Sequence, residues 1–331
     1  MINFWGDYIM DGIMADFIGE VELGKVQEFG GMSVIPLYTA GDSHDYLTLK
    51  EAMEANLITI TELDQQGMVP ELKVKNHADI PVLILDGEEL AGAKQNRVLN
   101  TTILLKEKSE TVIPVSCTEQ GRWRYTTPEF KDSGVVAAHR IRRSNLETVC
   151  HSLRVSGEYR SDQRAVWNAI EDLSDEAKVK SETRAMRDVY QNRMRDLNEY
   201  LESFPSQAGQ KGLLVVLDGE VVGLDLVSSS QAYSLLHEKL VKSYSMEAIL
   251  REGSSSEEIS GLVGSFLEDV KASTEEQHAS VGYGVDYRFE GNHSVGSSLV
   301  YKDQVIHAAF FSKDDLDQDL SSYRQRRSYR L

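Results

Sequence analysis

The sequence predicts an α+β protein in which hairpins build antiparallel sheets and a block of helices packs on one side. Short runs rich in Val, Ile, Leu and Thr, bounded by Gly, Asn, Asp or Pro, dominate residues 1–140, and this pattern is typical of strands. Apolar residues then recur at three- and four-residue steps within residues 161–204, which is the period of amphipathic helices. Because strands and helices occur in blocks and do not alternate, the order argues against a doubly wound parallel sheet.

The first part of the chain is expected to hold strands and one short helix. The helix spans Thr48–Asn56, with Thr48 or an earlier residue as its N-cap. The runs expected as strands are Ser33–Leu37, Leu57–Glu62, Pro81–Asp86, Thr101–Leu105 and Thr111–Ser116.

The rest of the chain mixes helices and strands. Ser161 is placed to cap one helix, and a longer one follows over Met186–Leu201 and stops before Pro205. Ser255 and Glu258 fit a capping box for the last helix. The other expected elements are strands at Leu213–Leu217 and Val221–Val227, helices at Gln231–Leu250 and up to about Lys271, and a hairpin at Leu299–Phe311 around Lys302–Gln304.

The chain is expected to form a single domain over residues 1–312, followed by a charged tail at 313–331. Two lobes, 1–144 rich in strands and 145–312 of mixed helix and strand, are the alternative. A short internal sequence similarity bears on this choice, because PVLILDGEELAG (Pro81–Gly92) resembles LLVVLDGEVVG (Leu213–Gly223). Asp-Gly between apolar runs is typical of a tight hairpin. The similarity is explained either by two unrelated hairpins or by a duplicated lobe.

Composition excludes several classes of protein. The 331 residues carry 35 Lys and Arg against 53 Asp and Glu, a net charge of −18, so extended nucleic-acid binding is not expected. The hydrophobic share of 41% is enough for a folded core. The two cysteines, Cys117 and Cys150, make neither a disulfide framework nor a zinc motif. Without a recognisable secretory signal or an apolar run long enough to span a membrane, we expect a cytoplasmic protein with no membrane partner.

The densest polar stretch is GEELAGAKQNRVLN, Gly87–Asn100, which lies between two apolar runs. Amides and an Arg supply directed donors, and Arg grips phosphate or carboxylate with a fork of N–H groups. A polar loop held by buried strands is a common place for binding groups. A solvated hairpin whose charges pair with each other is the alternative interpretation.

A second polar stretch is PVSCTEQGRWRY, Pro114–Tyr125, in which Arg and aromatic residues alternate. Such residues combine phosphate contact with stacking on a planar base, although on a strand the arginines and the aromatic rings would lie on opposite faces. The alternative is a packed Trp with two surface arginines. Between Arg122 and Arg164 there are nine Lys or Arg against five Asp or Glu. This basic excess suits an anionic ligand site, or it neutralises acidic faces elsewhere in the fold.

The two polar stretches carry a resemblance. GEELAGAKQNRVLNTTIL and IPVSCTEQGRW resemble the signature of the ARG and Rhodanese-Phosphatase-superfamily-associated protein domain family, and RSDQRAVWNAI, LLVVLDGEVVGLDL and GSSLVYKDQVIHAAFF extend the similarity over most of residues 30–312. The resemblance implies association with ADP-ribosylglycohydrolases and phosphatase-type partners, and work near ADP-ribose or NAD-derived nucleotides. It carries over no reaction. It makes site candidates of the polar positions Glu88, Glu89, Lys94, Gln95, Asn96, Arg97, Asn100, Glu119, Gln120, Arg122 and Trp123.

The leading hypothesis is the binding or processing of an ADP-ribose- or NAD-related nucleotide at a local basic pocket in which Arg97 and Arg122 meet the phosphates. If there is turnover, Glu88 and Glu119 are the candidates to orient water. No cofactor is assigned, and no metal site is expected. The groups expected to contact ribose or base are Gln95, Asn96 and Asn100, with Trp123 or Tyr125 stacking and Lys94 and Gln120 alongside. The alternative is a non-catalytic interaction module that regulates a partner enzyme through the Arg-rich tail, Arg324–Arg330.

Overall fold

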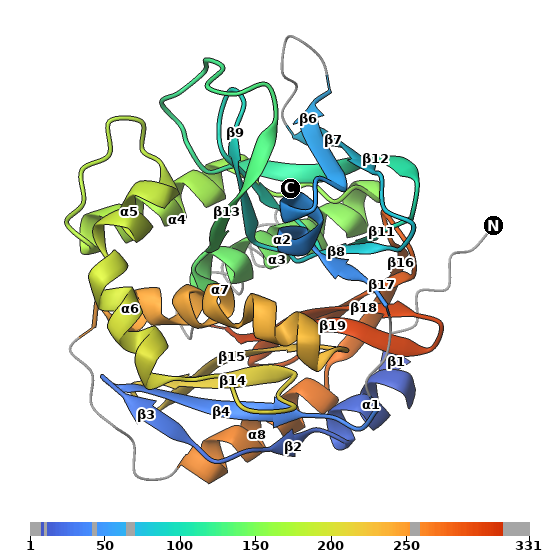
Figure 1. The fold of residues 1–331 in the computed structure, drawn as a ribbon. Coiled ribbons are helices and arrows are strands. Elements are labelled where there is room, and N and C mark those ends of the chain that lie inside the picture. Colours follow the sequence, from blue (N-terminus) through green and yellow to red (C-terminus); the bar gives the residue numbers. More distant parts are fainter. Residues whose placement is uncertain (1–7, 10–11, 42–44, 64–69, 252–258, 314–331) are drawn as a thin grey trace, which may run out of the picture.

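A computed structural model describes residues 8–9, 12–41, 45–63, 70–251 and 259–313. It confirms the α+β class, because helices pack on sheets that are antiparallel in all but one strand pair. Figure 1 shows a large sheet below and a smaller, curled sheet above, with one long helix between them. No described helix has both the length and the apolar character needed to cross a membrane.

The large sheet has ten strands and joins both ends of the described chain. In spatial order they are β1 (Tyr8–Ile9), β16 (Thr274–Ala279), β17 (Val285–Glu290), β18 (Ser294–Tyr301), β19 (Gln304–Ser312), β15 (Glu220–Val227), β14 (Gly212–Leu217), β4 (Met32–Tyr38) and β2 (Glu22–Leu23), with β3 (Gln27–Phe29) also paired to β4.

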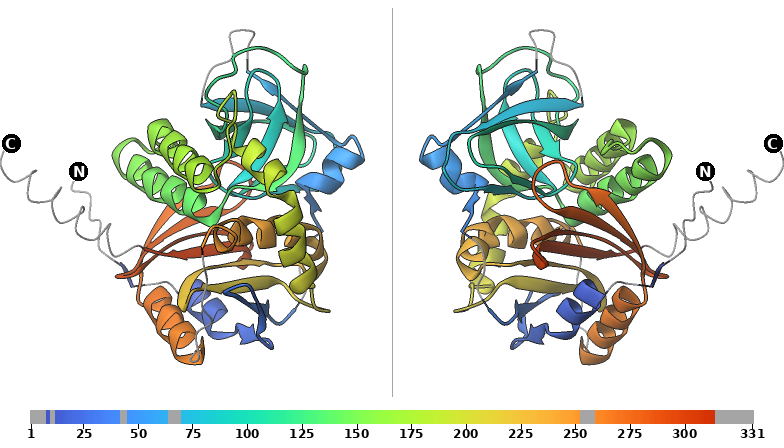
Figure 2. Two further views of the ribbon diagram at one scale, coloured as in Figure 1. Left: turned by 90° about the vertical axis from the view of Figure 1, so that its left-hand side faces the viewer. Right: turned by 90° about the vertical axis from the view of Figure 1, so that its right-hand side faces the viewer.

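Helices cover both faces of the large sheet, as the two side views in Figure 2 show. The odd-numbered residues of β14, such as Leu213, pack against α7 (Ser230–Ala248), whereas even-numbered ones such as Leu214 pack against α1 (Gly12–Gly19) and α8 (Ile259–Lys271). The helices therefore lie on both faces of the large sheet, and not in one block on one side of it. Burial on both faces explains why β14 reads as an unbroken apolar run.

The smaller sheet is a half-barrel of six strands, β13 (Phe130–Val136), β9 (Glu88–Gly92), β10 (Arg97–Leu99), β12 (Ser109–Cys117), β7 (Glu71–Asn76) and β6 (Ile58–Glu62). The sheet is curled, because β13 at one edge contacts β6 at the other. Its apolar interior is closed by the short helix α2 (Leu49–Glu54) and by a three-stranded sheet of β11 (Ile103–Leu105), β8 (Val82–Ile84) and β5 (Leu47–Thr48).

Four further helices follow β13 in the chain: α3 (His139–Ser156), α4 (Gln163–Glu176), α5 (Met186–Asn192) and α6 (Met194–Ser203). α4 and α5 contact the half-barrel, whereas α6 packs on α7 and on β3 of the large sheet. The sequence did not predict α3, which begins after Ala138 without a side-chain cap and is rich in Arg. It also predicted a single helix where α5 and α6 are separated at Arg193. The capping box proposed at Ser255 and Glu258 lies outside the described residues.

Strand pairing does not follow the proposed lobe boundary at residue 144. β4 pairs with β14 over its whole length, from Met32 opposite Leu217 to Leu37 opposite Gly212. The N-terminal strands therefore belong to the same sheet as the C-terminal ones, and the half-barrel is inserted between them.

The two similar Asp-Gly segments have different structures. Asp218 and Gly219 both have positive φ and form the tight turn between β14 and β15, as expected. Asp86 and Gly87 do not form a hairpin, because β8 and β9 belong to different sheets. Gly87 has φ +79°, and a Cβ there would lie 2.7 Å from Cγ of Arg142, so glycine is needed for Arg142 to pack.

A buried charge network joins the half-barrel to the large sheet. The Arg142 guanidinium on α3 donates to Asp86 (3.1 and 3.2 Å) and to Asp225 of β15 (2.8 and 2.6 Å). Tyr244 on α7 donates to Asp225 (2.7 Å), and His307 on β19 lies 3.3 Å from it. Burial would raise the pKa of Asp225, but the Arg142 charge holds it well below its ordinary value.

The N-cap of α2 gives a first prediction. The Glu51 amide donates to Thr48 Oγ1 (3.3 Å) while Glu51 Oε2 accepts from the Thr48 amide (2.8 Å), which is a complete capping box. Thr48→Ala is expected to lower the free energy of unfolding by about 1 kcal/mol in urea denaturation. Thr48→Ser keeps the hydroxyl and serves as the control; an equal loss in both variants would contradict the capping role.

Candidate functional site

The two polar segments that the sequence singled out lie side by side. β9 and β10 form a hairpin, and β10 also pairs with β12, with Arg97 opposite Cys117. The hairpin is not solvated, because every residue from Gly92 to Asn100 is buried. The loop after β12 folds back over the hairpin turn, where Thr126 donates its amide to Ala93 O at 3.0 Å.

Arg97 lies inside the half-barrel and not in a ligand pocket. Its Nη1 donates to Gln95 Oε1 and to Cys117 Sγ, both at 3.0 Å, and its Nη2 is 3.7 Å from Glu62 Oε1. Glu62 stands on β6, which is separated from β10 by two strands. The Arg97 side chain is completely buried, so it spans the barrel interior and is not available to a phosphate.

Arg122 lies on the other side of the hairpin. Its Nε donates to Glu119 Oε2 (2.8 Å), its Nη2 to Asn96 Oδ1 (3.1 Å) and its Nη1 to Ala93 O (2.7 Å). Burial would raise the pKa of Glu119, but the hydrogen bonds from Arg122 hold that pKa below its ordinary value. Arg122 therefore ties the loop to the hairpin, and its donors are already used.

The prediction that Arg97 and Arg122 meet in one electropositive hollow is wrong. Successive residues of a strand point to opposite faces, and Asn96 contacts Arg122 while Arg97 turns to the barrel interior. Each guanidinium is buried beside its own carboxylate. The sequence predicts that the two segments are adjacent, but it does not predict the direction of these side chains.

The aromatic residues of the loop contact Lys94 of the hairpin turn. Lys94 Nζ lies 5.2 Å from the ring centres of both Trp123 and Tyr125, a cation–π arrangement. Trp123 and Tyr125 keep 53% and 49% of their residue surface exposed.

Two other predicted residues make structural contacts. Asn100 donates to Tyr159 O (3.0 Å) and accepts from Ser116 (2.8 Å), and Gln120 accepts from Arg184 (3.0 Å). Neither lines the pockets described below.

A cavity of about 400 Å³, here called the α5 pocket, lies between the hairpin, the loop and α5. It brings together three of the predicted residues, Asn96, Glu119 and Arg122. Its further lining residues are Ala91, Gly92, Thr126, Thr127, Lys131, Asp132, Ala185, Arg187, Asp188 and Gln191.

Two cations of the α5 pocket were missed by the sequence reasoning. Among the described residues, no carboxylate lies within 4 Å of the charged groups of Lys131 or Arg187. In the sequence Arg187 is one polar residue of an amphipathic helix, and nothing local marks it as a site residue. Arg187 becomes a candidate site residue only through the packing of α5 against the hairpin.

Glu89 stands behind the α5 pocket, two residues before Ala91 on the same face of β9. It is fully buried and accepts a hydrogen bond from Thr118 Oγ1 at 2.8 Å. Burial raises the pKa of Glu89 to about 7, against the lowering effects of Thr118, Ser133 and the Arg187 charge. The carboxyl is thus poised to gain or lose a proton near neutral pH.

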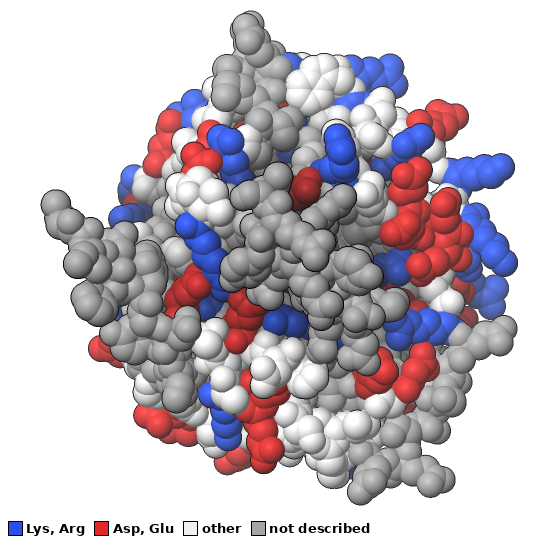
Figure 3. All heavy atoms as spheres, turned by 180° about the vertical axis from the view of Figure 1, so that it is seen from behind, with Lys and Arg blue, Asp and Glu red and all other residues white. Residues whose placement is uncertain are grey.

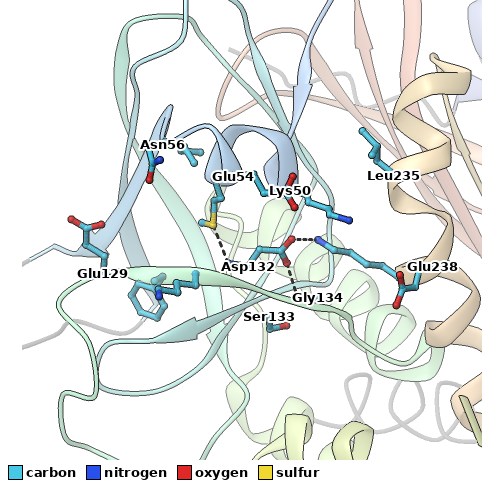
Figure 4. Close-up of a pocket in the computed structure, with 14 residues that line it drawn as sticks. Lys50, Glu54, Asn56, Glu129, Asp132, Ser133, Gly134, Leu235 and Glu238 are labelled. Atoms are coloured by element: carbon cyan, nitrogen blue, oxygen red, sulfur yellow. Dashed lines mark hydrogen bonds and ion pairs between the residues drawn. The ribbon is translucent and has the colours of Figure 1, made fainter. Parts of the chain in front are cut away.

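Glu88, the other predicted catalytic carboxylate, faces away from the α5 pocket. It accepts from Lys239 Nζ at 2.6 Å, and Lys239 also donates to Asp132 at 2.7 Å. Lys239 and Asp132 line a second cavity of about 640 Å³ between α2, β13 and α7, here called the α7 pocket (Figure 4). Lys131 and Asp132 line both pockets, so β13 is the wall between them.

The basic excess between Arg122 and Arg164 does not form one patch. Arg140 pairs with Glu176, Arg154 with Glu276 and Glu290, and Arg160 with Glu158. On the face shown in Figure 3, basic and acidic side chains are interspersed. The interpretation that these arginines neutralise acidic groups elsewhere accounts for most of them.

Comparison with known proteins identifies one family. The model of the ARG and Rhodanese-Phosphatase-superfamily-associated Protein domain matches residues 20–311, nearly the whole chain. No curated protein and no solved structure matches the chain.

Proposed function

We propose that this chain, which belongs to the ARG and Rhodanese-Phosphatase-superfamily-associated Protein domain family, binds a small anionic nucleotide-like ligand such as ADP-ribose in the α5 pocket. The observation that carries the proposal is the pair of cations, Lys131 and Arg187, which line a cavity of about 400 Å³ and have no carboxylate of the described residues within 4 Å of their charged groups. They take the phosphate-binding role first assigned to Arg97 and Arg122.

The exposed aromatic rings supply a place for a base. A shallow hollow formed by Tyr125, Thr126, Thr127 and Pro128 adjoins the α5 pocket through the two threonines that line both. A nucleotide whose phosphates contact Arg187 would extend its base along this shelf, where an aromatic face favours stacking. This adjacency supports a nucleotide over an isolated phosphate.

Processing of the ligand would use Glu119, which lines the α5 pocket, and Glu89, which stands behind it. Glu119, whose pKa is lowered, stays ionised and suits the orientation of water or a ribose hydroxyl. Glu89, with a pKa of about 7, suits a proton donor or acceptor. Glu88 is engaged with Lys239 and takes no part in this proposal.

Calorimetric titration with ADP-ribose tests the proposal. Arg187→Ala is expected to weaken binding about tenfold or more, because a charge-assisted hydrogen bond to phosphate contributes about 1.5–3 kcal/mol. Arg184→Ala is the matched control, since Arg184 is exposed and pairs with Glu171 outside the pocket. Absence of binding by the unmodified protein at millimolar ADP-ribose, or an equal loss in both variants, would refute it.

The alternative, a non-catalytic module that contacts a partner enzyme, placed its contact in the tail. That segment lies outside the described residues, and the alternative stays a prediction. Deleting residues 314–331 distinguishes the two, because the α5 pocket would retain its ligand.

A further inference from the structure

The α7 pocket is a second cavity that the proposed function does not use. It lies on the opposite side of β13 from the α5 pocket and is walled by α2, the start of β6, β13 and α7. In Figure 4, Glu129 and Asn56 lie toward one end, and Lys50 and Leu235 lie nearer the other. Its volume of about 640 Å³ is within the range of small-molecule sites.

An irregularity of β13 shapes the pocket wall. Asp132 pairs with Leu90, but Val136 pairs with Glu88, so β13 bulges between these positions. The bulge leaves Gly134 at φ +76° with its amide donating to Asp132 Oδ1 at 2.9 Å, and open space lies where its Cβ would be. Bulges often re-aim side chains beside functional sites, and here Asp132 is turned to Lys239.

The floor of the pocket is a fixed charge cluster. Lys239 is only 3% exposed, and its ammonium is clamped between Glu88 and Asp132. Burial would lower the pKa of Lys239, but the two carboxylates hold it above its ordinary value. The ammonium therefore stays charged and holds Glu88 and Asp132 in place in the pocket wall.

Unpaired charges of both signs stand around the mouth of the pocket. Among the described residues, none makes an ion pair with Lys50, Glu54 or Glu129. Glu238, by contrast, is bound by Lys242, and the charge of Lys50 also helps to lower its pKa. Apolar surface between these charges comes from Met53, Ile58, Phe130 and Leu235.

We propose that the α7 pocket binds a zwitterionic small molecule with an apolar body, such as a short peptide with free termini. Its ammonium would meet Glu129, its carboxylate would meet Lys50, and its side chain would lie on the apolar surface. A ligand with one charge would make only one of the two ion pairs and would therefore bind more weakly. The opposite rim charges thus select for a molecule that carries both.

Three matched probes test the proposal by calorimetry on the full chain: the dipeptide Leu-Ala, its N-acetyl form and its C-terminal amide. The zwitterion is expected to bind, and each capped form is expected to bind about threefold more weakly, which corresponds to about 0.7 kcal/mol for one exposed ion pair. In Glu129→Gln the difference between the dipeptide and its N-acetyl form should disappear. In Lys50→Met the difference between the dipeptide and its amide should disappear.

Glu182→Gln, an exposed position on neither pocket, is the control and should bind all three probes as the unmodified protein does. Equal binding of the capped and uncapped probes, or no binding of any at millimolar concentration, would overturn the proposal. The result is independent of the α5 pocket, since Arg187→Ala should leave dipeptide binding unchanged.

Discussion

Replacing Arg142 with Met is expected to lower the free energy of unfolding by about 3–5 kcal/mol, the range for removing one partner of a buried charge network. Arg142 and Asp225 are completely buried, and Asp86 nearly so. Without the guanidinium, two carboxylates remain in the junction between the half-barrel and the large sheet, with His307 beside them but without the permanent charge of Arg142. Urea denaturation at pH 7 measures the loss.

The same helix supplies the control. Arg154 on α3 pairs with Glu276 and Glu290, but its side chain is 40% exposed, and solvent-exposed pairs contribute about 0–1 kcal/mol. Arg154→Met should therefore cost much less than Arg142→Met, and equal losses would show that α3 tolerates neither change for reasons unrelated to the network.

Acid should shrink the Arg142→Met defect. Arg142 holds the pKa values of Asp86 and Asp225 below their ordinary range, so in the unmodified protein these carboxylates contribute stability above the unfolded pKa that is lost as pH falls. In the variant they can protonate readily at low pH. A defect that grows on acidification would contradict the assignment.

Local patterns were sufficient for most of the fold. β4, β12 and β14 fall where runs of β-branched and apolar residues end in turn signals, and α2 begins at the predicted Thr48 cap. Such features depend on residues that are close together in the chain, so they can be predicted from the sequence. α3 escaped prediction because its cap position, Ala138, offers no side-chain acceptor, and because Arg142 is an apparent surface residue whose burial depends on carboxylates far along the chain.

The site could be predicted only in part for a related reason. Pairing of β10 with β12 brings the two polar segments together, and their composition indicated that they matter. Which face each side chain takes depends on strand register, and a shift of one residue reverses it. Arg187 joins the α5 pocket through the packing of α5 on the hairpin, a contact between segments about ninety residues apart that no local pattern records.

Glu89→Gln is expected to make the protein more stable at pH 8 while changing little at pH 4.5. Burial raises the pKa of Glu89 from its ordinary 4.5 to about 7. As pH rises between these values, the unfolded chain releases this proton while the folded chain keeps it, so stability falls with pH and is lowest above pH 7. The full effect is about 3 kcal/mol, and Gln removes it because Gln carries no charge. Urea denaturation across pH 4.5–8 measures the difference.

Glu119→Gln is the matched control, because Glu119 lines the α5 pocket in front of Glu89 and has the opposite electrostatic environment. Arg122 lowers the pKa of Glu119, so this carboxylate stabilises the fold at neutral pH and loses that contribution in acid. Its replacement should therefore harm the protein most at pH 7 and progressively less as the pH falls. If both variants followed the same pH trend, the pKa of Glu89 would not be raised in the folded protein. The proton-transfer role proposed for Glu89 would then be refuted.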